Sequence, residues 1–303
     1  MNEKTDDIFL SLKQKVAIVG YGDFGKALGA MLDRAGASFW AWDANPEKSL
    51  TTSLEETVSG ADIIFFAVPT EALAKALAAS KSFFKEGAIF VFVSKGLDGD
   101  GRDAIDIAKE FVSENHLVFL GGPMVTENII KGEKYYPVMT GGGRARDSVA
   151  ELFSDDLASI TFSDDLKGVV ACGILKNFYA FLLGFAEGEE WSLEEKENLF
   201  SKCLEEMSKS VVLFGGEPET AMGMAGVEDL RFSASMTSDN FSDGMRTAKG
   251  IPPIGSESVK SAEAMKKKIG DAKDYPLLSS VCDIIVKNKN ISKKIKETIK
   301  END

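Results

Sequence analysis

The sequence of 303 residues predicts an α/β fold in two domains, a doubly wound sheet over residues 1–165 and a helical domain over residues 166–303. Two observations predict this division. In the first half, short apolar and β-branched runs alternate with helical segments, as in strands that helices cover on both faces. From Gly168 onward the pattern changes to helical spacing.

The first strand, turn and helix have the pattern of a dinucleotide-binding site. An apolar strand at residues 15–19 leads into Gly20-Tyr21-Gly22-Asp23-Phe24-Gly25, and a helix is expected over residues 26–35. The first glycine permits the turn, the second lets the backbone approach a pyrophosphate, and the third lets helix and strand pack closely. A second strand at residues 38–42 ends at Asp43, where an acid would bind the ribose hydroxyls. The order predicts a Rossmann-like domain that binds NAD.

The choice between NAD and NADP depends on the residues after the second strand. The Asp43 carboxylate favours NAD, because it repels a 2′-phosphate. Asn45 and Lys48 follow closely, and these side chains could accommodate that phosphate. NAD is therefore the expected cofactor, with NADP as the alternative.

The other expected strands direct polar residues to one edge of the sheet. They lie at residues 63–68, 88–93 and 117–120, with added edge strands at 138–140 and 159–162. The carboxyl ends of the first three are followed by Pro69-Thr70, Ser94-Lys95-Gly96 and Gly121-Gly122-Pro123. Ligands of open α/β sheets bind outside these ends, so Lys95 is expected in the ligand crevice. An ordinary surface charge is the alternative interpretation.

A single charge, Lys176 with Asn177 beside it, interrupts the long apolar run at residues 168–186. The run predicts the central helix of a soluble domain, because a membrane span would not favour an ammonium group at its centre. A buried lysine has a lowered pKa, which suits it to proton transfer. The alternative is that its aliphatic stem carries the charge to the surface. The residues alone leave both interpretations open.

Composition excludes several classes of function. The net charge of −13 argues against nucleic acid or anionic membrane as a partner. Cys172, Cys203 and Cys282 are odd in number and far apart, which predicts a reducing cytoplasm and neither a disulfide framework nor a metal site. Residues 1–14 lack the apolar core of a signal peptide. The single histidine, His116, precedes a strand and is expected to be structural, so acid–base chemistry would fall to lysine, carboxylate or tyrosine.

Several motifs together resemble the soluble, bacterial-type NAD(P)-dependent glycerol-3-phosphate dehydrogenases over nearly the whole chain. Besides the glycine turn, the matching segments are Phe66-Ala67-Val68-Pro69-Thr70, Ser94-Lys95-Gly96-Leu97, Gly122-Pro123, Gly173-Ile174-Leu175-Lys176-Asn177, Ala225-Gly226-Val227-Glu228-Asp229-Leu230 and Glu257. The resemblance implies hydride transfer between a nicotinamide and dihydroxyacetone phosphate or glycerol-3-phosphate, which supplies a precursor for phospholipid biosynthesis. It also implies a Rossmann-like domain followed by an all-helical domain.

The resemblance also implies roles for individual residues. Lys176 would donate or accept the proton, helped by Lys95 and Asp229, although from the residues alone Asp229 could equally cap a helix. The implied substrate-binding residues are Lys95, Gly122, Lys176, Asn177, Ser233 and Asn240. The implied cofactor-binding residues are Gly20, Gly22, Asp23, Phe24, Gly25, Asp43, Pro69, Lys95 and Glu257.

The chain departs from the family pattern near the expected substrate. Met124 and Thr126 stand where the family usually has serine and alanine, and Asp239 stands where it has a phosphate-binding arginine. That exchange removes a bidentate donor and adds repulsion between like charges. The nearby cations that could compensate are Arg231, Arg246 and Lys249.

Three hypotheses about function follow. The chain is a glycerol-3-phosphate dehydrogenase with a displaced phosphate grip, a dehydrogenase of the same architecture for another small hydroxy compound, or a nucleotide-binding homologue without turnover. The expected partner is a phosphorylated small molecule, with neither nucleic acid nor membrane insertion. The oligomeric state is left open, with a homodimer as a candidate.

Overall fold

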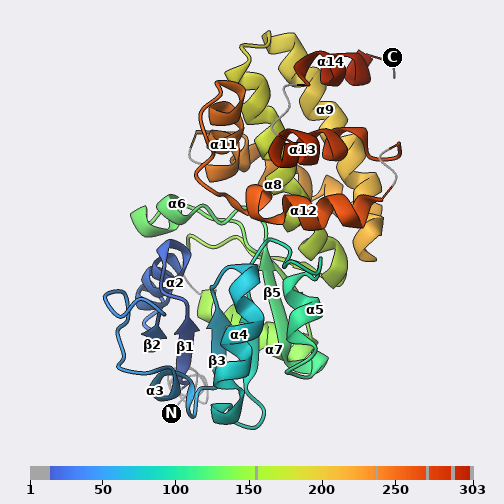
Figure 1. Cartoon of the computed structure of the whole chain (residues 1–303). Coiled ribbons are helices and arrows are strands. Elements are labelled where there is room, and N and C mark those ends of the chain that lie inside the picture. Colours follow the sequence, from blue (N-terminus) through green and yellow to red (C-terminus); the bar gives the residue numbers. More distant parts are fainter. Residues whose placement is uncertain (1–13, 154–155, 237, 271–272, 288–290, 301–303) are drawn as a thin grey trace. The chain divides into compact units, whose positions relative to one another are not determined.

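The chain forms two compact units (Figure 1). The computed structural model describes residues 14–153, 156–236, 238–270, 273–287 and 291–300. Unit 1 comprises Met1–Ser94 and Ala104–Asp164, and unit 2 comprises Lys95–Asp103 and Asp165–Asp303. Unit 2 is not one continuous range of the sequence, because the segment Lys95–Asp103 packs with its helices.

Unit 1 is built on a seven-stranded sheet in the order β2-β1-β3-β4-β5-β6-β7. The strands are β1 (Val16–Val19), β2 (Phe39–Trp42), β3 (Ile63–Phe66), β4 (Ile89–Phe92), β5 (Leu117–Gly121), β6 (Val138–Gly141) and β7 (Thr161–Ser163). Strands β1 to β5 are parallel, and β6 pairs antiparallel with β5. This order confirms the predicted doubly wound sheet, and β6 and β7 extend one edge as expected.

Helices cover both faces of this sheet, which is why its strands are apolar on both sides. The helices of unit 1 are α2 (Asp23–Arg34), α3 (Leu54–Val58), α4 (Thr70–Ser80), α5 (Ala104–Ala108), α6 (Thr126–Lys131) and α7 (Gly143–Ala150). Alternate strand residues such as Ile18 and Phe65 join α2, α6 and α7 in one buried cluster. On the other face α4 packs against α3 and α5, and Phe66 and Phe92 stack with ring centroids 5.5 Å apart.

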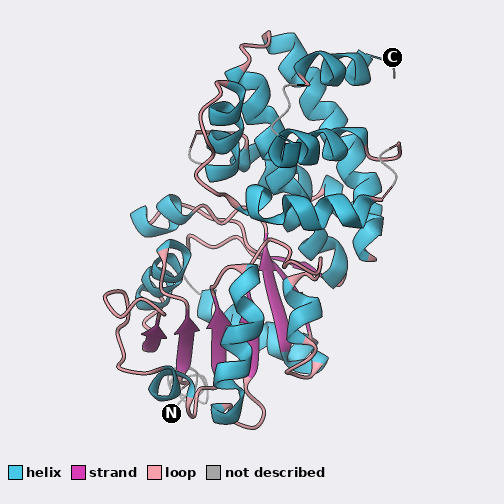
Figure 2. Cartoon of the chain, in the orientation of Figure 1, coloured by secondary structure: helices cyan, strands magenta, loops and turns pink. Residues whose placement is uncertain are grey.

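The described residues of unit 2 form helices joined by loops, and none of them belongs to a strand (Figure 2). Its α-helices are α8 (Leu166–Gly188), α9 (Leu193–Ser210), α10 (Asp229–Ser233), α11 (Asp239–Ala248), α12 (Glu257–Ile269), α13 (Pro276–Lys287) and α14 (Ser292–Lys300). Helix α8 is the core element, in contact with α9 to α13. It is long and apolar enough to cross a membrane, yet 94% of the most apolar window is buried inside the protein.

Two glycines explain why α8 and α11 can pack so closely. A Cβ atom on Gly184 of α8 would lie 2.0 Å from the carbonyl oxygen of Phe241, and one on Gly244 of α11 would lie 2.0 Å from that of Phe181. Any side chain at either position would force the helices apart. The close crossing fixes the start of α11, where Asn240 lies, against the middle of α8.

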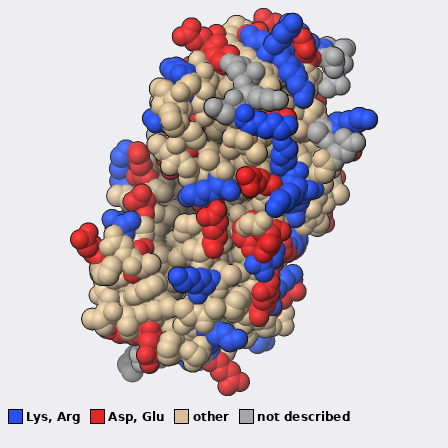
Figure 3. All heavy atoms as spheres, viewed as in Figure 1, with Lys and Arg blue, Asp and Glu red and all other residues tan. Residues whose placement is uncertain are grey.

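Charged side chains of both signs are mixed on the face drawn in Figure 3. The net charge of −13 therefore does not produce a surface of one sign on this face.

Candidate active site

Three charged side chains meet inside unit 2. The ammonium nitrogen of Lys95 lies 3.0 Å from Oδ2 of Asp229, and that of Lys176 lies 3.1 Å from Oδ1. Each carboxylate oxygen therefore holds a different ammonium group. The side chains of Lys95, Lys176 and Asp229 are only 17%, 13% and 3% exposed. We refer to these three residues as the ammonium cluster.

Helix α10 carries the carboxylate and a hydroxyl on one face. Asp229 and Ser233 are four residues apart, so their side chains project on the same side of the helix. The ammonium group of Lys176 donates to Oγ of Ser233 over 2.7 Å. Two of its three N–H groups are thus directed to α10, which fixes the orientation of the lysine.

Three residues of α8 form the face of the helix that contacts Lys95. Gly173, Lys176 and Asn177 are three and four residues apart and share one face of the helix. A Cβ atom on Gly173 would lie 3.2 Å from Cγ of Lys95, so the glycine makes room for the aliphatic stem of that lysine. One turn further, Lys176 brings the second ammonium group to Asp229.

Burial and charge act against each other in the cluster. Burial lowers the pKa of Lys95, and the positive charge of Lys176 lowers it further. The carboxylate of Asp229 raises this pKa but does not compensate for both effects, so the pKa stays below its ordinary value. Burial would raise the pKa of Asp229, but the two ammonium groups hold it below its ordinary value. Asp229 is therefore ionised at neutral pH, and Lys95 loses its proton more easily than a lysine in water.

The two asparagines expected at the substrate are turned toward each other. The amide nitrogen of Asn240 donates to Oδ1 of Asn177 over 3.1 Å, and the amide nitrogen of Asn177 donates to the main-chain oxygen of Lys95 over 2.8 Å. Asn177 is 4% exposed and Asn240 9%. Both lie beside the ammonium cluster, and both hold parts of the chain together.

In unit 1, the glycine turn has the features that a dinucleotide requires. Gly20 has a φ of +95°, and a Cβ atom there would lie 2.6 Å from the oxygen of Ala67. A Cβ atom on Gly25 would lie 2.1 Å from the oxygen of Gly20, so only glycine allows the turn and the helix to pack. A Cβ atom on Gly22 would meet nothing within 4 Å, and this residue precedes α2 as its N-cap without a side-chain hydrogen bond to the helix. The first N–H groups of α2 are therefore available to phosphate oxygens.

The acid at the end of β2 also fixes the turn. Oδ2 of Asp43 accepts the backbone N–H of Tyr21, and Oδ1 accepts that of Asn45, both over 2.8 Å. Asp43 therefore connects the glycine turn to the loop after β2.

The other predicted residues lie at the same sheet edge or in unit 2. Asp23 and Phe24 are the first residues of α2, with Asp23 exposed and Phe24 packed on the core. Pro69 precedes α4, and Gly122 follows β5 with a φ of +77°. Glu257 begins α12 in unit 2.

The positions that depart from the family pattern are spread over both units. Met124 is buried, and Thr126 begins α6 in unit 1. Asp239 begins α11 in unit 2, next to Asn240, and its side chain is exposed. Among the cations considered as replacements for the missing arginine, Arg246 donates through Nε to the oxygen of Pro252 over 2.9 Å.

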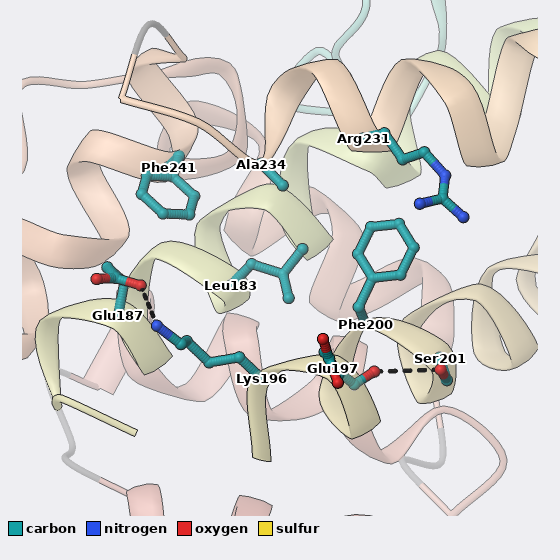
Figure 4. Close-up of a pocket in the computed structure, with 9 residues that line it drawn as sticks. All are labelled: Leu183, Glu187, Lys196, Glu197, Phe200, Ser201, Arg231, Ala234 and Phe241. Carbon is teal, nitrogen blue, oxygen red and sulfur yellow. Dashed lines mark hydrogen bonds and ion pairs between the residues drawn. The ribbon is translucent and has the colours of Figure 1, made fainter. Parts of the chain in front are cut away.

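Arg231 faces a separate pocket. It lies two residues after Asp229 on α10, which turns its side chain to the opposite side of the helix. Figure 4 shows its guanidinium group above the ring of Phe200, 5.1 Å from the ring centroid. This pocket between α8, α9, α10 and α11 has a volume of about 400 Å³, and none of the three residues of the ammonium cluster lines it.

Two serines on α12 were not predicted to belong to the site. The backbone N–H of Ser258 donates to Oδ1 of Asn240 over 3.0 Å, and Oγ of Ser261 accepts the N–H of Leu97 over 2.9 Å. No residue pattern could have identified them, because both act on groups far away in the sequence. The spacing of Gly173, Lys176 and Asn177, in contrast, shows that these residues share a helix face.

The chain is similar to known proteins over both units. Residues 46–136 match the model of the NAD-dependent glycerol-3-phosphate dehydrogenase N-terminus, and residues 165–296 match that of the C-terminus. The chain is 27% identical to a glycerol-3-phosphate dehydrogenase [NAD(P)+] of Fusobacterium nucleatum, over 93% of this chain and 96% of that protein. The corresponding enzyme of Bacillus subtilis is 29% identical, over 78% of this chain and 77% of that protein.

A solved structure shows the same fold. The crystal structure of glycerol-3-phosphate dehydrogenase from Coxiella burnetii superimposes with a TM-score of 0.86 at 20% identity, covering 95% of this chain and 99% of that chain. The two family models together span most of the sequence and agree with the motifs in both units. The chain therefore belongs to the NAD-dependent glycerol-3-phosphate dehydrogenase family.

Proposed function

We propose that the protein is an NAD(P)-dependent dehydrogenase that interconverts dihydroxyacetone phosphate and glycerol-3-phosphate. The observation that carries the proposal is the ammonium cluster, in which two buried lysines share the carboxylate of Asp229. Reduction of a ketone places negative charge on its oxygen, and ammonium groups in a site with little water stabilise that charge. Membership of the family connects this chemistry to the substrate.

The glycine turn of unit 1 would hold the cofactor. Its pyrophosphate fits the uncapped N-terminus of α2, and its ribose hydroxyls fit the carboxylate of Asp43. When bound, the cofactor supplies or accepts the hydride. Asp43 makes NAD the expected cofactor in preference to NADP.

Lys176 is the residue proposed to move the proton. Its ammonium group is held by Asp229 and by Ser233, so its N–H groups have fixed directions. In the direction of reduction Lys176 gives a proton to the substrate oxygen, and in the reverse direction its neutral amine removes a proton from the hydroxyl group. Lys95 adds a second positive charge beside Asp229, which stabilises the developing alkoxide.

The assay that tests this function follows the oxidation of NADH with dihydroxyacetone phosphate. We expect turnover at millimolar substrate and a lower KM for NADH than for NADPH. Absence of turnover would remove the proposal. Since Asp239 is exposed at the position of the family's arginine, turnover only with uncharged ketones or keto acids would favour a dehydrogenase for another hydroxy compound.

Asp239→Arg is expected to lower the KM for dihydroxyacetone phosphate. The substitution restores a bidentate donor and removes a negative charge near Asn240, which corresponds to about a tenfold change. Steady-state kinetics on wild type, Asp239→Arg and Asp239→Asn separate the two effects, because only the arginine variant adds a donor. An unchanged KM in the arginine variant would show that the missing arginine does not limit binding.

The site has implications for location and assembly. A dehydrogenase with NAD as its cofactor works where NAD is supplied, and its three described cysteines are free and buried, so we place the protein in the cytoplasm. The proposed partner is the phosphorylated small molecule alone, with neither nucleic acid nor membrane insertion. A homodimer stays a candidate assembly.

A further inference from the structure

A chain of hydrogen bonds in unit 2 runs from α12 through two asparagines to the backbone of Lys95. It begins at the N–H of Ser258, which donates to Oδ1 of Asn240 over 3.0 Å. Asn240 then donates to Oδ1 of Asn177 over 3.1 Å, and Asn177 donates to the carbonyl oxygen of Lys95 over 2.8 Å. Each amide therefore accepts one bond and donates the next.

The two ends of the chain determine the orientation of both amides. Ser258 offers a backbone N–H, which can only donate, and Lys95 offers a carbonyl oxygen, which can only accept. If either amide were reversed, two acceptors or two donors would face each other in a buried place. Each position thus requires a side chain that accepts one bond and donates another, and an ionised aspartate could not replace either asparagine without breaking a bond.

Lys95 needs such a support because it does not lie on a helix or strand. It begins the segment Lys95–Asp103, which leaves β4 and packs with unit 2. Further along, Leu97 is bound by Ser261, and Asp103 by Lys167. At the start of the segment, the bond from Asn177 and the contact with Gly173 hold Lys95 against α8.

We propose that Asn177 and Asn240 are positioning residues that hold the Lys95 ammonium group at Asp229 by fixing the backbone of Lys95. The proposal rests on the dehydrogenase function of the ammonium cluster. This role is distinct from substrate binding, because the bond from Asn177 ends on the backbone oxygen of Lys95. Asn240 acts on Lys95 only through Asn177.

Asn240→Asp tests the link at a distance from Lys95. The carboxylate keeps the bond to Ser258 but gives Asn177 no donor, so Asn177 must turn its amide nitrogen to residue 240 and its oxygen to the Lys95 carbonyl. Asn177→Leu breaks the bond to Lys95 directly without adding charge. We expect kcat to fall about 100-fold in Asn177→Leu, as for small displacements of a catalytic group, while the KM for dihydroxyacetone phosphate changes less than about threefold.

The double variant distinguishes a serial chain from two independent contacts. If Asn240 acts through Asn177, then Asn240→Asp lowers kcat in the wild type but causes no further loss in Asn177→Leu. Additive losses, or a rise in KM with an unchanged kcat, would overturn the proposal in favour of direct substrate contacts. Asn198→Asp, on α9 and outside the chain of bonds, is the matched control and should retain wild-type kinetics.

Hydrogen exchange provides a readout that needs no substrate. We expect faster amide exchange at residues 96–98 in both variants, with melting temperatures that show a folded protein and with unchanged affinity for NADH. Equal exchange in wild type and variants would overturn the positioning role. A wild type without turnover but with faster exchange in the variants would instead show that only the proposed function fails.

Discussion

Lys176→Ala is expected to abolish turnover and to leave cofactor binding nearly unchanged. The substitution removes the ammonium group that lies 3.1 Å from Oδ1 of Asp229 and 2.7 Å from Oγ of Ser233, and alanine offers no titratable group in its place. Loss of a general acid–base group costs on the order of 10³-fold in kcat. NADH affinity should persist, because the glycine turn lies in unit 1. The measurements are kcat with dihydroxyacetone phosphate and the Kd for NADH by fluorescence.

Lys196→Ala is the matched control for this variant. Lys196 is also a partly buried lysine of unit 2 that is paired with a carboxylate, Glu187, over 2.7 Å, but it lines the pocket of Figure 4. Its removal should leave kcat unchanged. A Lys176→Ala enzyme that retained most of its kcat would contradict the assignment of the proton to this residue.

Asp229→Asn is expected to damage both stability and turnover. The amide has the shape of the carboxylate, but it leaves two buried ammonium groups without a counter-charge. Removing one partner from a buried ion pair costs about 3 kcal/mol of unfolding free energy. Repulsion between the two ammonium groups also favours loss of a proton from one lysine. Without the Asp229 carboxylate the proton donor is misplaced as well, so kcat should fall about 100-fold. Urea unfolding and steady-state kinetics measure the two effects.

Adding Lys95→Met to Asp229→Asn tests whether charge causes the loss of stability. The double variant has one buried ammonium group, and its cluster again carries the net charge of the wild-type cluster. We therefore expect stability to recover in part, while turnover stays low because Lys95 no longer assists. If the double variant were less stable than Asp229→Asn, repulsion between the lysines would not be the cause.

The same cluster predicts an acid dependence of wild-type stability. The two ammonium groups outweigh burial and hold the pKa of Asp229 below its ordinary value of 3.8. Between the lowered pKa of the folded state and the ordinary value, the folded protein therefore binds fewer protons than the unfolded chain. The stabilisation is fully present above the ordinary pKa and is lost as the pH falls through the lowered one. Asp229→Asn should show a flatter stability profile below pH 4 than the wild type.

Local residue patterns predicted the framework of the protein well. Apolar periodicity over short segments predicts the strands of unit 1 and the helix around Lys176. In the structure these elements lie within a few residues of the predicted ranges. The same holds for the turn that begins at Gly20, since its glycines are required by contacts inside one strand–turn–helix segment. The resemblance to a family added the roles of Lys176 and its helpers, which spacing alone left open.

Contacts between distant residues could not be read from such patterns. Lys95 follows a strand of unit 1 in the sequence, but its segment packs with unit 2, where it meets a carboxylate 134 positions away. Arg231 looked available to replace a missing cation, but the turn of α10 directs it to the ring of Phe200. Helical periodicity states which residues share a face, and it does not state what that face meets. That pairing depends on how α8, α10, α11 and α12 pack, which is decided by close contacts such as those at Gly184 and Gly244.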